Sequence, residues 1–399
     1  MDTFVSVEHA LAAVLASARV TAPESVPLAQ AVGRTLAAPV VADGPLPPFD
    51  TSAMDGYAVR LADLPAPGAL PLAGAVHAGD AAPMALPPGA AVAVMTGAPL
   101  PAGAQAVVPI EWTERRAEAV HFNRLPTSGL SIRRAGEALA AGAVVLEAGA
   151  VVTVGAVGLL ASVGAATLSV RRRPVVAVVS TGDELVDADR PIGPSQIRDS
   201  NGPALAAQVE AAGGQPLRLH AADRTDDLAR VLDASLDADV LVFAGGVSMG
   251  ERDLVRPALD ARGVEWAFWQ VRQRPGKPLA FGTWDGRPVI GLPGNPVSAV
   301  VGFEVYVRPL LAACLGRADE PAPETGALAE AVAKRPGLTT FVRVTAARTA
   351  SGALVLSPAG SQGSHVALSL LASDGLAVLP ADWPDAPAGA QVPFRPWGW

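Results

Sequence analysis

Residues 175–185 read VVAVVSTGDEL, an apolar run that ends in a turn carrying two carboxylates. A continuous apolar run that stops at a glycine turn is typical of a strand buried on both faces of a parallel sheet. Similar runs occur at Pro216–Ala222, Val240–Phe243, Val264–Gln270 and Val289–Leu292, separated by helix-length segments. This alternation predicts an α/β domain with a parallel-rich sheet over residues 171–317.

The segments between these runs carry helix signals. Ser200 or Asn201 can cap a helix that begins near Pro203, and the glycines from Gly213 end it. A second helix is expected from Thr225, because two aspartates follow in its first turn. Two more helices are predicted at Leu254–Arg262 and Val297–Leu311.

Outside residues 171–317 most apolar runs are short and lie between Gly and Pro turns, so the sequence predicts a multi-domain α/β plus β protein. The first twenty residues are expected to form an amphipathic helix, and the apolar stretch 148–170 is expected to return and pack against it, with a short buried helix at Gly155–Val163. Residues 1–45 with 140–170 would then form a discontinuous helical and β linking domain. Short apolar runs between Gly and Pro turns predict a β-barrel-like domain at 46–139 and a small all-β domain at 318–399.

Composition limits the functional classes. The 399 residues carry a net charge of −8, which argues against a nucleic-acid or anionic-membrane partner. A single cysteine, Cys314, cannot form an internal disulfide, so a reducing, cytoplasmic location is expected, with Cys314 in a core helix. Ala148–Val170 is uncharged, but Gly149 and Gly164 interrupt it, which favours a strand and short helix over a membrane span.

Polar residues follow the predicted strands. Because ligands bind beyond the carboxyl ends of parallel strands, these loops are expected to lie at one edge of the sheet. Gly245-Gly246 with Ser248 offers backbone N–H groups and a hydroxyl to an oxyanion, although an ordinary turn would look the same. The loops also contain four carboxylates that would repel one another unless a cation such as Mg²⁺ binds them, the alternative being solvated loop acids or helix caps: Asp183, Glu184, Asp223 and Asp253.

A cationic segment, Arg272-Gln-Arg274-Pro-Gly-Lys277-Pro278, is opposite in sign to these loops. Cations beside a metal-binding acid cluster suit phosphoryl or oxometalate chemistry, whereas a surface salt-bridge cluster is the simpler alternative. Upstream, the turns at Phe49–Ala58 and Met95–Pro99 offer carboxylates and hydroxyls, and His365 stands in a glycine-containing loop that is able to face a ligand.

Seven segments occur together in one order along the chain: Phe49–Ala58, Met95–Pro99, Ile132–Glu137, Ser180–Leu185, Gly245–Asp253, Pro275–Pro278 and Pro293–Ser298. In this combination the sequence resembles the MoeA family of molybdopterin molybdenumtransferases and the related gephyrin E domain, over essentially its whole length. The resemblance implies an elongated homodimer of four-domain subunits with an α/β domain like that of MogA. It also implies adenylylated molybdopterin and molybdate as substrates, release of AMP assisted by a divalent cation such as Mg²⁺, and a MogA-type adenylyltransferase as a partner.

The same resemblance assigns roles by motif. Asp55 and Thr96 resemble residues that act across the dimer, and Glu184, Asp223 and Asp253 resemble the acids that hold the cation. The substrate contacts would come from Gly245, Gly246, Ser248, Pro293, Asn295, Pro296 and Ser298. The molybdate pocket would comprise Arg274, Lys277, Pro278, Arg343 and Ser364.

Two positions depart from the family pattern. Arg274 stands where the family usually has lysine, which exchanges a compact ammonium for a fork-shaped guanidinium. Ala138 stands where a carboxylate is usual. Two other functions remain open: a nucleotide pyrophosphatase or nucleotide-binding enzyme that uses the MogA-like domain alone, and a gephyrin-like scaffold protein. The first would leave residues 1–170 unexplained, and the second would need partner-binding segments that this sequence lacks.

Overall fold

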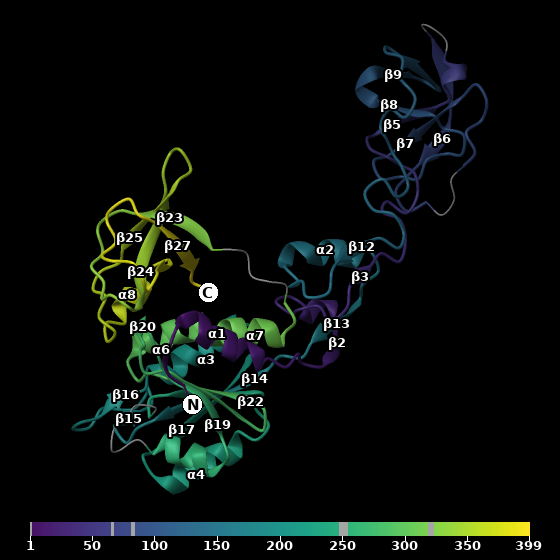
Figure 1. Cartoon of the computed structure of the whole chain (residues 1–399). Helices are drawn as coiled ribbons and strands as arrows, with labels where there is room; N and C mark the ends of the chain where they lie inside the picture. Colours follow the sequence, from purple (N-terminus) through teal and green to yellow (C-terminus); the bar gives the residue numbers. More distant parts are fainter. Residues whose placement is uncertain (1, 65–67, 81–83, 247–253, 318–322) are drawn as a thin grey trace.

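The computed structural model describes residues 2–64, 68–80, 84–246, 254–317 and 323–399. Figure 1 shows an elongated chain, with an α/β body, a β body beside it that contains the C-terminus, and a second β body at the far end of a slender connection. The connection is the linking module described below. This arrangement agrees with the predicted multi-domain α/β plus β fold.

A seven-stranded sheet forms the α/β body, with the order β1-β19-β21-β22-β18-β14-β17. Four strands are parallel to one another, as predicted: β14 (Val175–Thr181), β17 (Gln215–Ala221), β18 (Val240–Ala244) and β22 (Arg287–Leu292). The antiparallel strand β21 (Ala280–Trp284), which the sequence did not predict, joins β22 to β19 (Glu265–Val271).

Helices cover both faces of this sheet. Val176 and Val178 of β14 pack into one apolar cluster, and Ala177 and Val179 pack into the other, so this strand is buried from Val176 onward. The predicted helices are present: α3 (Asn201–Ala211), α4 (Thr225–Ala234), α5 (Val255–Ala261), α6 (Pro296–Gly302) and α7 (Arg308–Cys314). The single helix predicted at Val297–Leu311 is interrupted by a π-helical turn, η4 (Phe303–Val307).

The amino terminus differs from the prediction. Residues Asp2–Val5 form β1, which pairs in parallel with β19, and α1 (Val7–Ala16) follows with Ser6 as its N-cap. Buried side chains of α1 belong to the same core as α7. The expectation that 148–170 packs against this helix is therefore wrong, because the apolar face of α1 is covered by the α/β body instead.

A linking module is built from two short antiparallel pairs. These are β2 (Pro23–Pro27) with β13 (Thr167–Arg171), and β3 (Val40–Val41) with β12 (Val144–Leu146). Helix α2 (Val154–Ser162) and the turn η1 (Leu28–Gln30) complete it. Only Leu160 of α2 is buried, and Val154 is 77% exposed, so the helix predicted here exists but covers the surface rather than filling a core.

Two further β bodies flank these parts. The far body has the strand order β8-β5-β7-β6-β10-β9, comprising Ala106–Pro109, Gly56–Val59, Ala91–Val94, Ala69–Val76, Ala119–Phe122 and Thr113–Arg116. The same region also contains the antiparallel pair β4 (Thr51–Ser52) and β11 (Ile132–Arg133) and the turns η2 (Leu61–Asp63) and η3 (Ile110–Trp112). The C-terminal body has the order β20-β24-β25-β23-β27-β26, comprising Gln273–Arg274, Thr339–Arg348, Leu354–Pro358, Glu324–Leu328, Gln391–Pro396 and Gly375–Leu379, with α8 at Leu368–Leu371.

Strand β20 joins the C-terminal body to the α/β body. Its two residues, Gln273 and Arg274, follow β19 after Arg272 and pair in parallel with Thr339 and Thr340 of β24. This pairing holds the cationic segment of the α/β body against a sheet whose other strands come from the last fifth of the chain.

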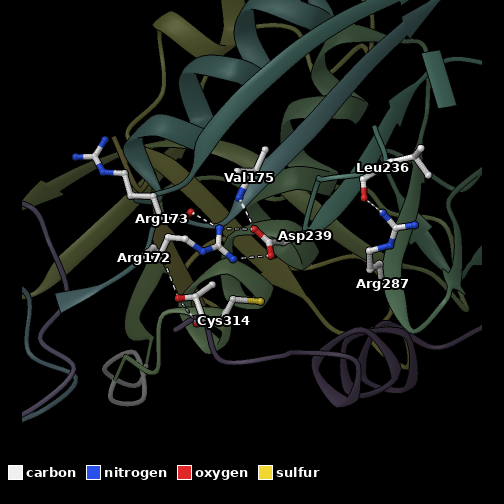
Figure 2. Close-up of polar contacts among 8 residues, drawn as sticks. Arg172, Arg173, Val175, Leu236, Asp239, Arg287 and Cys314 are labelled. Atoms are coloured by element: carbon white, nitrogen blue, oxygen red, sulfur yellow. Dashed lines mark hydrogen bonds and ion pairs between the residues drawn. The ribbon is translucent and has the colours of Figure 1, made fainter. Parts of the chain in front are cut away.

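At the amino-terminal ends of the central strands, an ion pair ties the linking module to the sheet. The Arg172 guanidinium donates to both oxygens of Asp239 at 2.9 and 2.8 Å, and the Val175 backbone N–H donates to the same carboxylate at 2.7 Å (Figure 2). Cys314 is buried close by, as predicted, and burial raises the pKa of its thiol.

One helical stretch, Pro296–Cys314, is long and apolar enough to span a membrane, but 78% of its most apolar window is buried within the protein. It therefore has the properties of a core helix.

Candidate active site

The loops that leave the four parallel strands lie at one edge of the sheet, as the sequence predicted, because the strands are parallel and in register. Strand order arranges them along this edge. The acidic loops after β17 and β14 come first, the glycine turn Gly245–Gly246 after β18 is next, and the loop Pro293–Pro296 after β22 is last. The acids therefore lie at one end of this edge, after β17 and β14.

Three carboxylates and Leu254 line a cavity of about 920 Å³, termed here the acid cavity. The acids are Asp183, Glu184 and Asp223, and the Asp223 backbone N–H donates to Asp183 Oδ1 at 3.2 Å. Partial desolvation raises the pKa of Asp223, and the charges of Asp183 and Glu184 raise it further. Such mutual repulsion is relieved by a bound cation.

The backbone places Glu184 over Gly182. Gly182 has a φ of +145°, and a Cβ at this position would lie 2.5 Å from Glu184 Oε2. After this turn, β15 (Leu185–Val186) pairs with β16 (Ile197–Arg198), and residues 193–196 of the loop between them line one side of the acid cavity. Glycine is thus needed at 182 for the Glu184 carboxylate to fold back toward the strand end.

The predicted metal ligands are only partly brought together. Glu184 and Asp223 share the acid cavity, whereas Asp253 and also Ser248 lie outside the described residues. Across the described parts of the chain, no three His, Cys, Asp or Glu side chains are arranged to hold a metal ion.

The glycine turn packs closely on its neighbours. Gly246 has a φ of +62°, and a Cβ there would lie 2.4 Å from Val255 Cγ2 and 2.7 Å from Thr181 Oγ1. Gly245 donates its N–H to the Leu292 carbonyl at 3.1 Å. The turn therefore exposes bare backbone at the boundary between the acid cavity and the next cavity.

A second cavity, of about 720 Å³, lies between the α/β and C-terminal bodies and is termed here the cation cavity. Arg274 and Lys277 line it, and the Lys277 ammonium also lies 4.8 Å from the centre of the Phe4 ring. Of the other predicted residues, those lining the same cavity are Gly245, Gly246, Pro278, Pro293, Asn295, Ser298 and Ser364.

The loop carrying Ser364 is fixed to the start of α6. The Asn295 side-chain amide donates to Ser364 Oγ at 3.1 Å, and the Val297 backbone N–H donates to the Ser364 carbonyl at 3.1 Å. Pro296 does not line the cavity, and instead occupies the first turn of α6.

Arg343 lies behind the cavity wall rather than in it. Its side chain is fully buried, and it donates to Ser369 Oγ at 2.8 Å and to the Ser361 carbonyl at 3.0 Å. Among the described residues, Nη1 has no hydrogen-bond partner. Burial, together with the nearby charge of Arg274, lowers the pKa of Arg343 to about 10, so the group remains a cation at neutral pH.

The sequence reasoning missed three polar residues of the cation cavity: Arg335, Gln273 and Gln362. Arg335 precedes a Pro-Gly turn, as Arg274 does, and this similarity was the available signal. Gln273 was passed over because its charged neighbours dominate the motif.

Asp55 and Thr96 form a separate pair. Asp55 Oδ1 accepts from the Thr96 backbone N–H at 2.7 Å and from its hydroxyl at 2.8 Å, and these bonds lower the pKa of Asp55. The pair is exposed on the far β body, next to β5 and β7, which Figure 1 shows well apart from the α/β body. One chain alone does not bring Asp55 to the cavities.

Three family models match successive parts of the chain. They are described as the MoeA N-terminal region (domain I and II) over residues 5–164, a probable molybdopterin binding domain over 177–313, and the MoeA C-terminal region (domain IV) over 325–397. The match covers the regions of all the seven segments on which the resemblance rests.

Known proteins match over nearly the full length. Molybdopterin molybdenumtransferase 2 of Mycobacterium tuberculosis is 40% identical over 94% of this chain and 95% of its own, and the Haemophilus influenzae molybdopterin molybdenumtransferase is 35% identical over 94% of each. A crystal structure of a molybdopterin biosynthesis MoeA protein from Pyrococcus horikoshii, 30% identical, superposes with a TM-score of 0.83 over 99% of this chain and 100% of its own. By sequence and by fold, this chain belongs to the MoeA family of molybdopterin molybdenumtransferases.

Proposed function

We propose that this chain transfers molybdenum from molybdate to the dithiolene of adenylylated molybdopterin, with the oxyanion held in the cation cavity. The main support for this assignment is the positive charge of the residues that line the cavity. Arg274, Lys277 and Arg335 line the cavity, and no carboxylate does so among the described residues. A cavity with several cations and no counter-ion attracts a compact dianion such as molybdate.

Arg343 supports the same site from behind. Its hydrogen bonds to the Ser361 and Gly363 carbonyls hold the loop that presents Ser364 to the cavity. Its buried charge adds to the positive potential, and among the described residues it has no ion-pair partner and its Nη1 donates to no acceptor. The predicted role of Arg343 is therefore to shape and charge the molybdate pocket.

The acid cavity is the proposed binding region for a divalent cation such as Mg²⁺. Asp183, Glu184 and Asp223 offer hard oxygen atoms there, although the three side chains are not arranged as a metal site in this structure, so the substrate would have to supply further ligands. Burial and the charges of Asp183 and Glu184 raise the pKa of Asp223, and a bound cation would relieve the repulsion between these acids. A bound cation would neutralise charge on the pyrophosphate as AMP leaves. The Gly245–Gly246 turn lines the cation cavity and has no side chains, so a phosphate group of the same substrate could approach its backbone closely.

A homodimer would complete the site. Asp55 is held as a carboxylate by Thr96 but lies far from both cavities of its own chain (Figure 1). We therefore propose that it acts on the cavities of a partner subunit. Mixing an Asp55→Ala chain with an Arg274→Ala chain should then restore about a quarter of the wild-type activity, since half of the dimers are mixed and each has one complete site.

The proposal includes a cytoplasmic location and a MogA-type adenylyltransferase that supplies the adenylylated substrate. The single, buried cysteine is consistent with the cytoplasmic location. The adenylyltransferase is included because the substrate must be adenylylated before it binds.

The direct test is incubation with adenylylated molybdopterin, molybdate and Mg²⁺, measuring AMP and metal-loaded cofactor. Both products should appear, and each should depend on molybdate. AMP release that continues unchanged without molybdate would instead support the nucleotide pyrophosphatase function.

A further inference from the structure

A buried pair of polar side chains links Gln273 of the cationic segment to Tyr306 of η4, a residue with no role assigned above. Tyr306 and Gln273 are 0% and 1% exposed, and the Tyr306 hydroxyl donates to Gln273 Oε1 at 2.5 Å. Burial raises the pKa of the Tyr306 phenol, so the hydroxyl keeps its proton and remains a donor. Such a pair in an otherwise apolar core needs a reason, because a buried hydrogen bond adds little net stability.

The other end of Gln273 holds the turn. Its Nε2 donates to the carbonyls of Pro275 and Gly276, each at 3.2 Å. Both acceptors are carbonyls, so the amide nitrogen must face them and the amide oxygen must face the tyrosine. The two carbonyls belong to the Pro-Gly turn that separates Arg274 from Lys277. The amide therefore fixes the spacing of the two cations.

The π-helical turn explains how Tyr306 reaches this position. Ser298, eight residues earlier on α6, lines the cation cavity, and its carbonyl would lie 3.6 Å from a Cβ at Gly276. In a continuous α-helix a residue eight positions later would point about 80° away from Ser298. A π turn absorbs about one extra residue and reduces this to about 20°, so Ser298 and Tyr306 share one face of the helix.

We propose that Tyr306 is a positioning residue for the oxyanion: through Gln273 it holds the Arg274–Lys277 turn in the geometry that binds molybdate. This inference rests on the proposed function of the cation cavity. Tyr306 touches no substrate and acts only through the amide.

The test compares Tyr306→Phe with wild type in the full chain. The ring is kept, so the core stays filled, but Gln273 Oε1 loses its donor. The KM for molybdate should rise about 3- to 10-fold while kcat changes less than about twofold, and molybdate should raise the melting temperature of the variant less than that of wild type. Gln273→Glu, which cannot donate to the turn carbonyls, should weaken molybdate binding at least as much.

Two controls separate positioning from general destabilisation. Ser235→Ala removes another buried hydroxyl, which donates to the Val231 carbonyl in α4, and should lower stability without changing the KM for molybdate. In a Gln273→Met background, Tyr306→Phe should have no further effect on KM, because the path to the turn is already broken.

The outcomes are distinguishable. If Tyr306→Phe leaves the KM unchanged while Arg274→Ala raises it, the positioning role is refuted and the pocket stands. If neither Arg274→Ala nor Lys277→Ala changes the KM, the assignment of the cation cavity fails, and the role of Tyr306 fails with it.

Discussion

The two ends of the central strands handle charge in opposite ways. At the amino-terminal ends, Arg172 and Asp239 form a bidentate ion pair, and the Asp239 carboxylate also accepts a hydrogen bond from the Val175 N–H (Figure 2). At the carboxyl ends, acids gather in one cavity and cations in another. Paired charges neutralise each other within the protein. Charges separated by sign instead leave an electrostatic potential that a charged ligand can neutralise.

Removing a cation from the carboxyl-end cavity should have the largest effect of three substitutions that test this contrast. Arg274→Ala should lower molybdate-dependent AMP release about 10- to 100-fold, as expected for loss of a charged contact. Thermal stability should be unchanged or slightly higher, because Arg274 repels the buried Arg343. Steady-state kinetics and a melting curve measure the two effects.

The matched control is Arg173→Ala, an exposed arginine at the other end of the sheet, whose side chain extends away from Asp239 in Figure 2. Its activity should equal that of wild type. A loss as large as that of Arg274→Ala would mean that overall charge, rather than the cavity, controls the rate.

The opposite pattern is expected at the amino-terminal end. Asp239→Asn should lower the free energy of unfolding by about 1–2 kcal/mol, since it weakens charge-assisted bonds that remain partly exposed. Activity per folded molecule should be preserved. Denaturant unfolding provides the measurement, and Asp285→Asn, which changes an exposed carboxylate 4.0 Å from Arg287, should change stability by less than about 0.5 kcal/mol. If Asp239→Asn and Asp285→Asn lowered the free energy of unfolding equally, the Arg172–Asp239 pair would contribute no more to stability than the Arg287 pair.

The smallest effect concerns the acid cavity. Because the folded pKa of Asp223 is raised, its charged form is disfavoured by folding, and this cost is present at neutral pH and disappears as the pH falls below the folded pKa. Asp223→Asn should therefore leave stability equal or slightly higher at neutral pH, by less than about 0.5 kcal/mol.

The affinity for Mg²⁺, measured from the Mg²⁺ dependence of AMP release, should fall as the pH is lowered through the raised pKa of Asp223. In Asp223→Asn this pH dependence should be weaker. A wild-type affinity that is flat with pH would remove Asp223 from the proposed ligands.

Local patterns in the sequence were sufficient for the central strands. Val175–Thr181 is buried on both faces, and its uninterrupted apolar run reflects that burial directly. Strand β21 was missed because Gly282 and Thr283 interrupt its apolar residues. Strand β1 was missed because four residues carry no periodicity, and their partner β19 lies more than 250 positions away.

The candidate site also has features that local sequence predicts and features that it does not. The loops after parallel strands are predictable, since the strand-end rule is general, and the structure places them together. The separation of acids from cations depends on the order of strands across the sheet, which is a nonlocal property. Arg335 lines the cation cavity close to the pairing of β20 with β24, and the Arg-Pro-Gly sequence at 335 is a local signal that does not report this pairing.

The distance between Asp55 and the cavities of its own chain has a consequence for how activity depends on the amount of protein. If each complete site needs groups from two chains, the fraction of working sites follows the monomer–dimer equilibrium, and specific activity falls on dilution below the dissociation constant. A cell that makes little of this protein would then lose activity more steeply than in proportion to the number of chains.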